Sequence, residues 1–113
     1  MANYEVNKAA VRNAERLIRD GKVDSSTEWS DGQPSTDAEN EFIDEHGYEA
    51  FGEWHLAIDT DAGEETKSRY AFPFGDFSKV HRDGLNSAKQ RAAQYDHDEI
   101  ERAADDLLEK LRD

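Results

Sequence analysis

The aromatic side chains of this chain are concentrated in one central segment, and this limits the core that the chain can build. Eight of its eleven aromatic residues lie between positions 42 and 77. Leu, Ile, Val and Phe together account for only 19 of the 113 residues, a share typical of disordered chains. Each aromatic side chain, however, can bury on the order of 150–250 Å². We therefore expect a folded chain with a small core around a central aromatic cluster, formed by Phe42, Tyr48, Phe51, Trp54, Tyr70, Phe72, Phe74 and Phe77.

Hydrophobic periodicity predicts a helix over residues 6–20, where apolar residues recur on one face. A second, short helix is expected over residues 36–45. Thr36 and Glu39 have the spacing of a capping box at its start, and Gly47 follows as its stop.

The clearest pattern lies in the last third of the chain. One helix is expected to begin at Asp83 or a neighbouring residue, and a second to follow a cap formed by Asp96 with Glu99. The second helix carries an apolar stripe along its length, and Lys110 is expected to pair with Asp106 on the outer face. The short connection between them predicts a helical hairpin.

The segment between these helices fits more than one structure. Residues 48–58 alternate like a strand from Trp54 onward, but their aromatic residues also suit a continuing helix. Residues 69–77 alternate weakly, and Pro73 limits them to an edge strand or an extended loop. The fold class is therefore predicted as mainly α, with α+β as the alternative.

The expected architecture is one domain over residues 1–113, with four helices and at most two short strands around the aromatic cluster. Residues 24–36 are rich in turn-forming polar residues and are expected to form a loop, which Trp29 pins to the core.

Acidic residues dominate the composition. The chain has 27 Asp and Glu against 14 Lys and Arg, which gives a formal net charge of −13. The carboxylates are spread along the sequence, and Lys is scarce, as in proteins of salt-adapted organisms, where high salt screens self-repulsion. The alternative is an acidic mimic that occupies the nucleic-acid-binding surface of a partner.

Several function classes are excluded by what the sequence lacks. Without cysteine there are no disulfides, thiolate nucleophiles or cysteine-based metal sites. The four histidines show no metal-binding spacing, so neither a metal nor another cofactor is expected. No apolar run approaches the length of a membrane span, and the first residues do not resemble a signal peptide. A cytoplasmic protein without membrane contact is therefore expected.

The charge is inverted locally over residues 67–91, called here the basic-aromatic segment. It contains six Lys and Arg against two Asp, and aromatic residues lie among them. Basic and aromatic residues at the start of a helix suit an anionic ligand, a nucleic acid or a protein partner. The predicted ligand-binding residues are Lys79, His81 and Arg82 as anion contacts, Arg69 as support, and Trp54 and Tyr70 as a neighbouring aromatic surface. Alternatively, the segment neutralises carboxylates of its own chain or of a second copy.

An enzymatic interpretation is also open. Asp76 could orient His55 or His81 as a general base, which would suit a small hydrolase. Serines are present, but none lies in a nucleophile-elbow sequence, and there is no glycine-rich phosphate loop. A non-enzymatic binding or assembly protein is therefore the main functional prediction, with self-association as a further option.

Six ordered blocks of sequence carry a resemblance to a known family. They are residues 29–34, 40–47, 54–58, 66–77, 80–85 and 97–111. In these blocks the chain resembles an uncharacterised family of small acidic proteins from haloarchaea and actinobacteria. Arg-Tyr-Ala-Phe-Pro at 69–73, followed by the helix near His81, is also similar to a small module found beside phage head-maturation proteases. The resemblances imply a stand-alone domain of viral or mobile-element origin, and they assign no activity, cofactor or catalytic residue.

Overall fold

Helices make up most of the computed structural model, which describes residues 3–111. Within these residues the α-helices are α1 (Lys8–Arg19), α2 (Trp29–Gly32), α3 (Thr36–Gly52), α4 (Arg82–Gln94) and α5 (Asp98–Leu111), with a 3₁₀ turn at Lys67–Arg69. The strands are β1 (Tyr4–Val6), β2 (Val23–Asp24), β3 (His55–Asp59), β4 (Tyr70–Pro73) and β5 (Val80–His81). The prediction of a mainly helical chain with strands is confirmed. The expected numbers, four helices and at most two strands, are too low.

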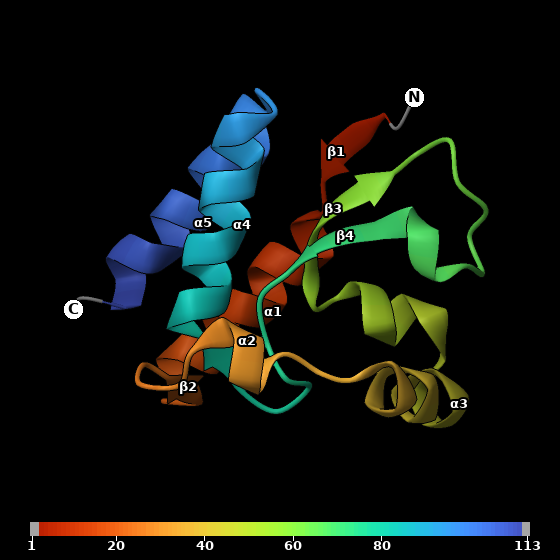
Figure 1. Cartoon of the computed structure of the whole chain (residues 1–113), viewed down its shortest axis with the longest axis horizontal. Helices are drawn as coiled ribbons and strands as arrows, with labels where there is room; N and C mark the ends of the chain where they lie inside the picture. Colours follow the sequence, from red (N-terminus) through yellow and green to blue (C-terminus); the bar gives the residue numbers. More distant parts are fainter. Residues whose placement is uncertain (1–2, 112–113) are drawn as a thin grey trace.

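Three of the strands form one antiparallel sheet in the order β1-β3-β4. β3 is central, and β4 lies at one edge, as Pro73 requires of a strand. The remaining two strands, β2 and β5, form a separate two-residue parallel pair that places Asp24 opposite His81. Figure 1 shows the three-stranded sheet beside α4 and α5, with α2 and β2 below them.

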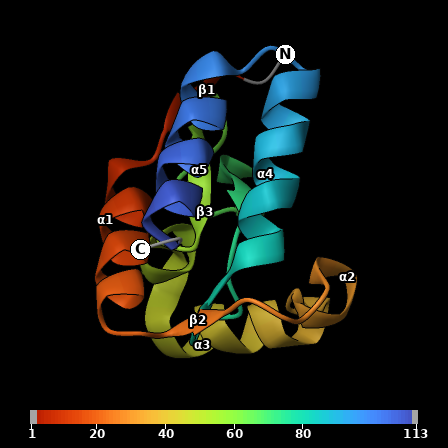
Figure 2. The ribbon, with the colours of Figure 1, turned by 90° about the vertical axis from the view of Figure 1, so that its left-hand side faces the viewer.

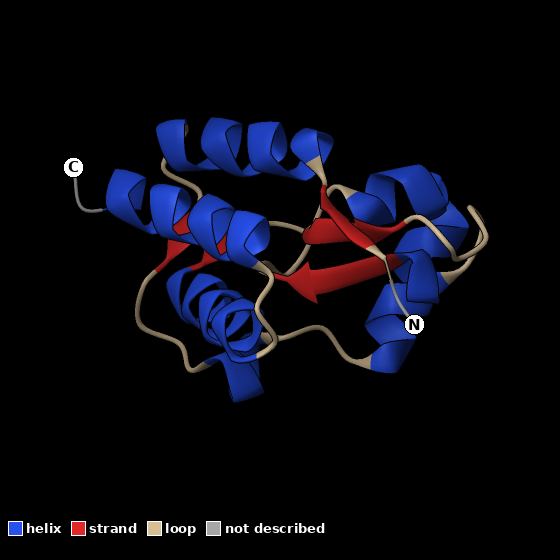
Figure 3. Cartoon of the chain, turned by 90° about the horizontal axis from the view of Figure 1, so that it is seen from above, coloured by secondary structure: helices blue, strands red, loops and turns tan. Residues whose placement is uncertain are grey.

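The helices α1, α4 and α5 pack together against the three-stranded sheet. The predicted helical hairpin is formed by α4 and α5, which run side by side (Figure 2). Seen from above, the sheet lies between these helices and the end of the molecule occupied by α3 (Figure 3). α2 contacts α4 near its N-terminal end, and β1 contacts α5.

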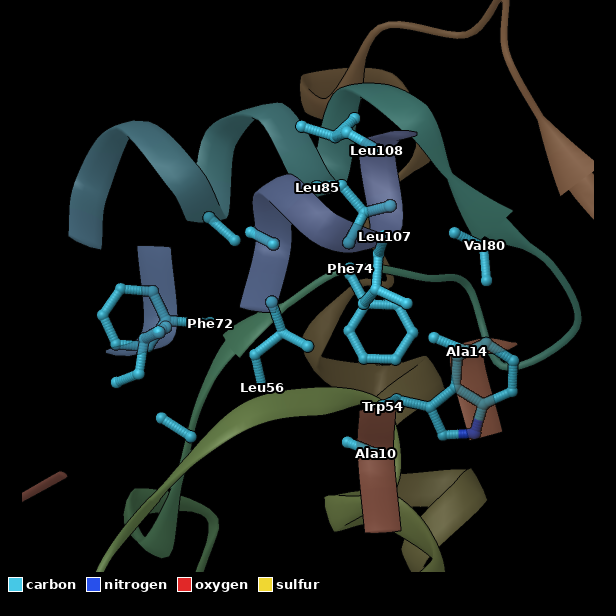
Figure 4. Packing of buried hydrophobic residues seen from close by; sticks show 14 of the residues in the cluster. Ala10, Ala14, Trp54, Leu56, Phe72, Phe74, Val80, Leu85, Leu107 and Leu108 are labelled. Carbon is cyan, nitrogen blue, oxygen red and sulfur yellow. The ribbon is translucent and has the colours of Figure 1, made fainter. Parts of the chain in front are cut away.

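The hydrophobic core lies between the sheet and these helices (Figure 4). Its largest fully buried side chains there include Phe74, Leu56, Leu85, Leu107 and Val80. The expected aromatic cluster is therefore only part of the core, because the apolar stripes of α4 and α5 supply much of the rest. None of the helices within residues 3–111 is both long and apolar enough to cross a membrane.

The N-terminal helix begins later than its periodicity predicts, because the preceding residues form a strand. β1 pairs with β3, and the backbone N–H of Asn7 continues this pairing by donating to the carbonyl of Leu56 at 2.8 Å. The side chain of Asn7 donates to the carbonyl of Gly52, and that of Asn13 to the carbonyl of Glu53. These two asparagines fasten α1 to the end of α3, a long-range contact that no local pattern encodes.

Residues 48–58, whose pattern fits either a helix or a strand, form the end of α3 and most of β3. Gly47 interrupts α3 with a φ of 86°, after which the chain resumes a helical turn to Gly52 and then enters β3. The cap of α3 is Ser35 and not the predicted Thr36, since the Ser35 hydroxyl accepts the N–H of Ala38 at 3.1 Å. The predicted loop over residues 24–36 also contains the short helix α2.

Two local expectations about the C-terminal helices are wrong. Asp96 adopts a φ of 60° after α4, and the N–H of Glu101 bonds to the carbonyl of His97, so α5 begins beyond the predicted Asp96 cap. Lys110 bonds to Glu15 of α1 at 2.6 Å instead of pairing with Asp106. Packing of α5 against α1 decides this partner.

Candidate functional site

A wide hollow lies between the edge strand β4 and helix α4, and we call it the β4–α4 groove. Its volume is about 730 Å³, within the usual range for ligand pockets. β4 and α4 contribute most of its lining, and the remaining lining residues come from β1, from α2 with the residue after it, and from the turn between α4 and α5. The lining residues are Tyr4, Trp29, Gln33, Ala71, Phe72, Pro73, Ser87, Ala88, Gln90, Arg91, Gln94, Tyr95 and His97.

The charge of this groove differs from that of the rest of the molecule. None of its lining residues is Asp or Glu, although the chain has 27 of them. Its one Arg, Arg91, is exposed and makes no salt bridge or side-chain hydrogen bond with the residues that the structure describes. The groove therefore offers a guanidinium that makes no ion pair with the described residues, in a hollow whose lining includes no carboxylate.

Aromatic rings form the end of the groove near the turn between α4 and α5. The rings of Tyr4, Phe72 and His97 meet edge to face, with centroids 5.2 to 5.9 Å apart. Phe72 has a φ of 63°, which is uncommon for a residue with a side chain and is held here by the packing of its buried ring. Tyr95 at the same end is 58% exposed, which is unusual for a large side chain in this molecule. This end of the groove is therefore lined by packed aromatic rings.

A second polar arrangement, the Asp76–His81 pair, lies outside the groove. The Nε2 of His81 donates to the Asp76 carboxylate at 2.8 Å, and the backbone amides of Lys79 and Ser78 donate to the same carboxylate. Burial raises the pKa of Asp76, but these hydrogen bonds outweigh it and hold the pKa below its usual value. The pair is thus an ionised aspartate that fixes the orientation of a histidine.

The other ring nitrogen of His81 is enclosed. His81 is 2% exposed, and its Nδ1 has no hydrogen-bond partner among residues 3–111. The ring lies edge to face with Trp29 and directly against Gly32, where an added Cβ would be 2.7 Å from Nδ1. A substrate would reach this nitrogen only if α2 moved away.

The predicted aromatic site residues are placed mainly inside the molecule. Trp54 is 7% exposed, and its ring lies 6.0 Å from that of Phe74. Tyr70 is half-buried, and its ring packs near Phe51 and His55. His55 itself is 4% exposed and lies apart from the Asp76–His81 pair, with its Nδ1 bonded to the carbonyl of Phe51.

The predicted basic residues do not share one surface. Arg69 donates to the carbonyl of Ala62 at 3.0 Å, and Lys79 is exposed near the Asp76 turn. Arg82 lines a different, polar hollow that also contains Glu28 and Asp83.

Two further basic residues of the basic-aromatic segment pair with carboxylates of the same chain. Lys67 lies 3.4 Å from Glu39, and Lys89 lies 2.7 Å from Asp105. Part of the segment therefore does neutralise the protein's own charge, as the alternative interpretation expects.

Several groove residues were not singled out by the sequence pattern, among them Arg91, Gln90 and Gln94. A weak sequence feature does mark them, since they lie on one face of α4. This helix contains a single acidic residue, although the chain as a whole is acidic. Tyr4 and His97 carry no such feature, because they reach the groove only through the pairing of β1 and the turn before α5.

Comparison with protein-family models, with curated proteins and with solved structures gives no match for this chain. Its function is therefore inferred from the geometry described above, and the resemblance found in the sequence stays a prediction.

Proposed function

We propose that this chain is a non-enzymatic binding protein that holds an anionic group of its partner in the β4–α4 groove. Seven of the thirteen residues that line the groove belong to the basic-aromatic segment. The observation that carries the proposal is that no Asp or Glu lines the groove beside Arg91, in a chain whose net charge is −13. Where acidic residues are this frequent, a wide hollow lined by none of them is a place where an anion escapes local repulsion.

The lining side chains favour binding over catalysis. A guanidinium holds a carboxylate, sulfonate or phosphate through two parallel hydrogen bonds. Around Arg91 lie amide and hydroxyl groups on α4 and aromatic rings on the opposite wall, which suit an orienting contact and an apolar contact respectively. The one histidine of the groove, His97, is held against Tyr4 and Phe72 and has no carboxylate beside it among the lining residues.

A fluorescence titration with anilinonaphthalene sulfonate tests this proposal, because the probe combines aromatic rings with one negative charge. Replacing Arg91 by Gln should weaken binding roughly fivefold, since an exposed ion pair contributes up to about 1 kcal/mol. The matched control is Lys79→Gln, which removes an exposed positive charge outside the groove. It should leave the affinity unchanged, and near-UV circular dichroism checks that all three proteins are folded.

Equal affinity of the wild type and Arg91→Gln would refute the proposed site. A loss of affinity in Lys79→Gln or Arg82→Ala, with none in Arg91→Gln, would move the anion contact to the start of α4, where the sequence alone locates it.

A second candidate function, a small hydrolase, is favoured by one specific observation, the Asp76–His81 hydrogen bond. Such a histidine can act as a general base when its free nitrogen reaches a substrate. In this case that nitrogen is covered by α2, so activity would require α2 to open. Hydrolysis of a nitrophenyl ester that His81→Gln abolishes and Arg91→Gln leaves intact would favour this candidate over the binding function.

A further inference from the structure

Helix α1 carries a stripe of positive charge outside the β4–α4 groove. The helix contains four Lys and Arg against one Glu, whereas the whole chain contains 14 against 27. At 3.6 residues per turn, the four cations fall within about 80° of one another around the helix axis, and the buried residues of α1 lie on the other side. All four are exposed, and we call them the α1 stripe: Lys8, Arg12, Arg16 and Arg19.

The α1 stripe is not neutralised by carboxylates of its own molecule. None of its four side chains makes a salt bridge with the residues that the structure describes. Arg16 donates to the neutral side chain of Asn13 at 2.6 Å. Glu15, the one carboxylate of α1, accepts a hydrogen bond from Lys110 of α5 instead. The stripe therefore stays positively charged in a chain rich in possible acidic partners.

The stripe also opposes the stability of its own helix. Lys8 is the first residue of α1, where the helix dipole repels a cation, and no acidic residue occupies the first turn. Lys8, Arg12 and Arg16 follow one another at four-residue spacing, and like charges at this spacing destabilise a helix. Folding therefore gives no reason for the stripe, and binding to a negatively charged surface does.

Helix α3 carries the complementary pattern. It contains six Asp and Glu and no Lys or Arg. Four of the carboxylates are exposed, precede the interruption at Gly47 and share one helix face, and we call them the α3 stripe: Asp37, Glu41, Asp44 and Glu45. Their one salt bridge with the described residues is a 3.7 Å contact between Glu45 and His46, whose side chain is half exposed.

The two stripes have the same spacing. Cations recur every four residues from Lys8 to Arg16, and carboxylates recur every four residues from Asp37 to Glu45. At 1.5 Å per residue, each of these series extends over about 12 Å. No salt bridge joins α1 to α3 within the described residues. In Figure 2, α1 runs along one side of the molecule and α3 along its base, so the stripes are separate surfaces.

We propose that the α1 stripe binds the α3 stripe of a second copy of this chain. Because the stripes are different surfaces, each copy offers one of each. Repulsion between two molecules of net charge −13 is screened beyond about 8 Å at physiological ionic strength, whereas facing stripes are in contact. Each exposed ion pair contributes little, so the association is weak and reversible. The inference does not depend on the proposed function, since no residue of either stripe lines the β4–α4 groove.

A nucleic acid fits the α1 stripe less well than a second copy does. The stripe covers roughly 16 Å, and the phosphates of a nucleic acid would continue beyond it onto the acidic rest of the molecule. Glu15 and Glu53 also line a hollow beside the stripe, where they would meet phosphates. The carboxylates of the α3 stripe, in contrast, extend no further than the α1 stripe.

Sedimentation equilibrium of the full chain tests the proposal, at concentrations up to roughly millimolar and in KCl of physiological ionic strength. The wild type should associate reversibly. Arg12→Glu combined with Arg16→Glu should weaken association roughly tenfold or more, because like charges then face each other. Glu41→Lys combined with Asp44→Lys should weaken it as much, although this variant has less net negative charge than the wild type.

Net charge is controlled by Glu64→Lys combined with Glu65→Lys, which changes two exposed carboxylates outside both stripes. This variant should associate at least as strongly as the wild type. An equimolar mixture of the two stripe variants should associate again, because the first keeps the α3 stripe and the second keeps the α1 stripe. Near-UV circular dichroism checks folding. If the α1 variant does not fold, Arg12→Gln combined with Arg16→Gln replaces it and should weaken association severalfold.

A wild type that stays monomeric over the whole concentration range would overturn the inference. Equal association of the α3 variant and the Glu64, Glu65 control would overturn it too, because the α3 stripe would then have no role. Oligonucleotide binding that is lost in the α1 variant, without self-association of the wild type, would replace the second copy with a nucleic acid. The titration of Arg91 with anilinonaphthalene sulfonate tests the proposed function separately, since Arg91 belongs to neither stripe.

Discussion

Burial of His55 makes the stability of this protein depend on pH in a defined window. The ring is 4% exposed, and burial lowers its pKa from 6.5 to about 4, although the hydrogen bond to the Phe51 carbonyl acts in the opposite direction. In the unfolded chain the same imidazole has its ordinary pKa of about 6.5. Between these two values the unfolded state therefore binds more protons than the folded state, so the free energy of unfolding falls as pH is lowered.

The size of the effect follows from the two pKa values. A shift of one pKa unit corresponds to 1.36 kcal/mol, so lowering the pH from 7.5 to 4 should cost about 3 kcal/mol through His55 alone. The measurement is urea unfolding followed by tryptophan fluorescence at several pH values, in molar KCl to screen carboxylate repulsion. Wild type is compared with His55→Asn, whose side-chain amide can still donate to the Phe51 carbonyl.

The difference in stability between these two proteins should change by about 3 kcal/mol across the window. The control, His46→Asn, removes a histidine whose side chain is 53% exposed, and its stability should run parallel to that of wild type. If the free energies of unfolding of wild type and His55→Asn vary with pH in parallel, the proposed contribution of His55 is refuted. If His55→Asn does not fold, the nuclear magnetic resonance titration of wild-type His55 decides instead: a midpoint near pH 6.5 would refute it.

Two structural predictions can be checked by the same unfolding measurement. Gly75→Ala would place a Cβ 2.5 Å from the ring of Trp54 and 2.6 Å from a backbone carbonyl, and should lower the free energy of unfolding by about 2 kcal/mol or more. The control is Gly63→Ala, where the nearest atom to an added Cβ is 3.5 Å away, and it should change stability little. Equal stabilities would contradict this packing. Ser35→Ala removes the observed cap of α3 and should cost about 1 kcal/mol, while Thr36→Ala should cost less. A larger loss of stability in Thr36→Ala than in Ser35→Ala would show that Thr36 is the cap, as predicted from the sequence.

The best sequence predictions concern elements whose pattern is local. The hairpin of α4 and α5 follows from apolar residues at helical spacing, and the edge position of β4 follows from the missing N–H of Pro73. Element boundaries were less accurate. Ser35 and Thr36 are both good capping residues, and only the geometry of the chain before α3 selects Ser35.

The strands β1, β2 and β5 were missed because two or three residues are too few to show a period. Each is stabilised by its partner: β1 by β3 and β2 by β5, both more than fifty positions away in the sequence. Long-range pairing of this kind leaves no mark in a short window of sequence.

The candidate site was likewise predicted only in part from the sequence. The sequence located a positively charged segment among aromatic residues, and this segment supplies seven of the thirteen residues that line the groove. It could not show which of the charges are free. Lys67 and Lys89 bond to acidic residues of other elements, whereas Arg91 makes no such bond with the residues that the structure describes.

The sequence by itself determined the excess of acidic residues, the helical ends of the chain and the local excess of positive charge over residues 67–91, because composition and periodicity are properties of neighbouring residues. Only the tertiary structure decided that α4 lies beside β4 and that Arg91 lines a hollow without carboxylates among its lining residues. These features depend on the register between strands and on the packing of helices from distant parts of the chain. Such contacts are fixed by the whole set of side chains together.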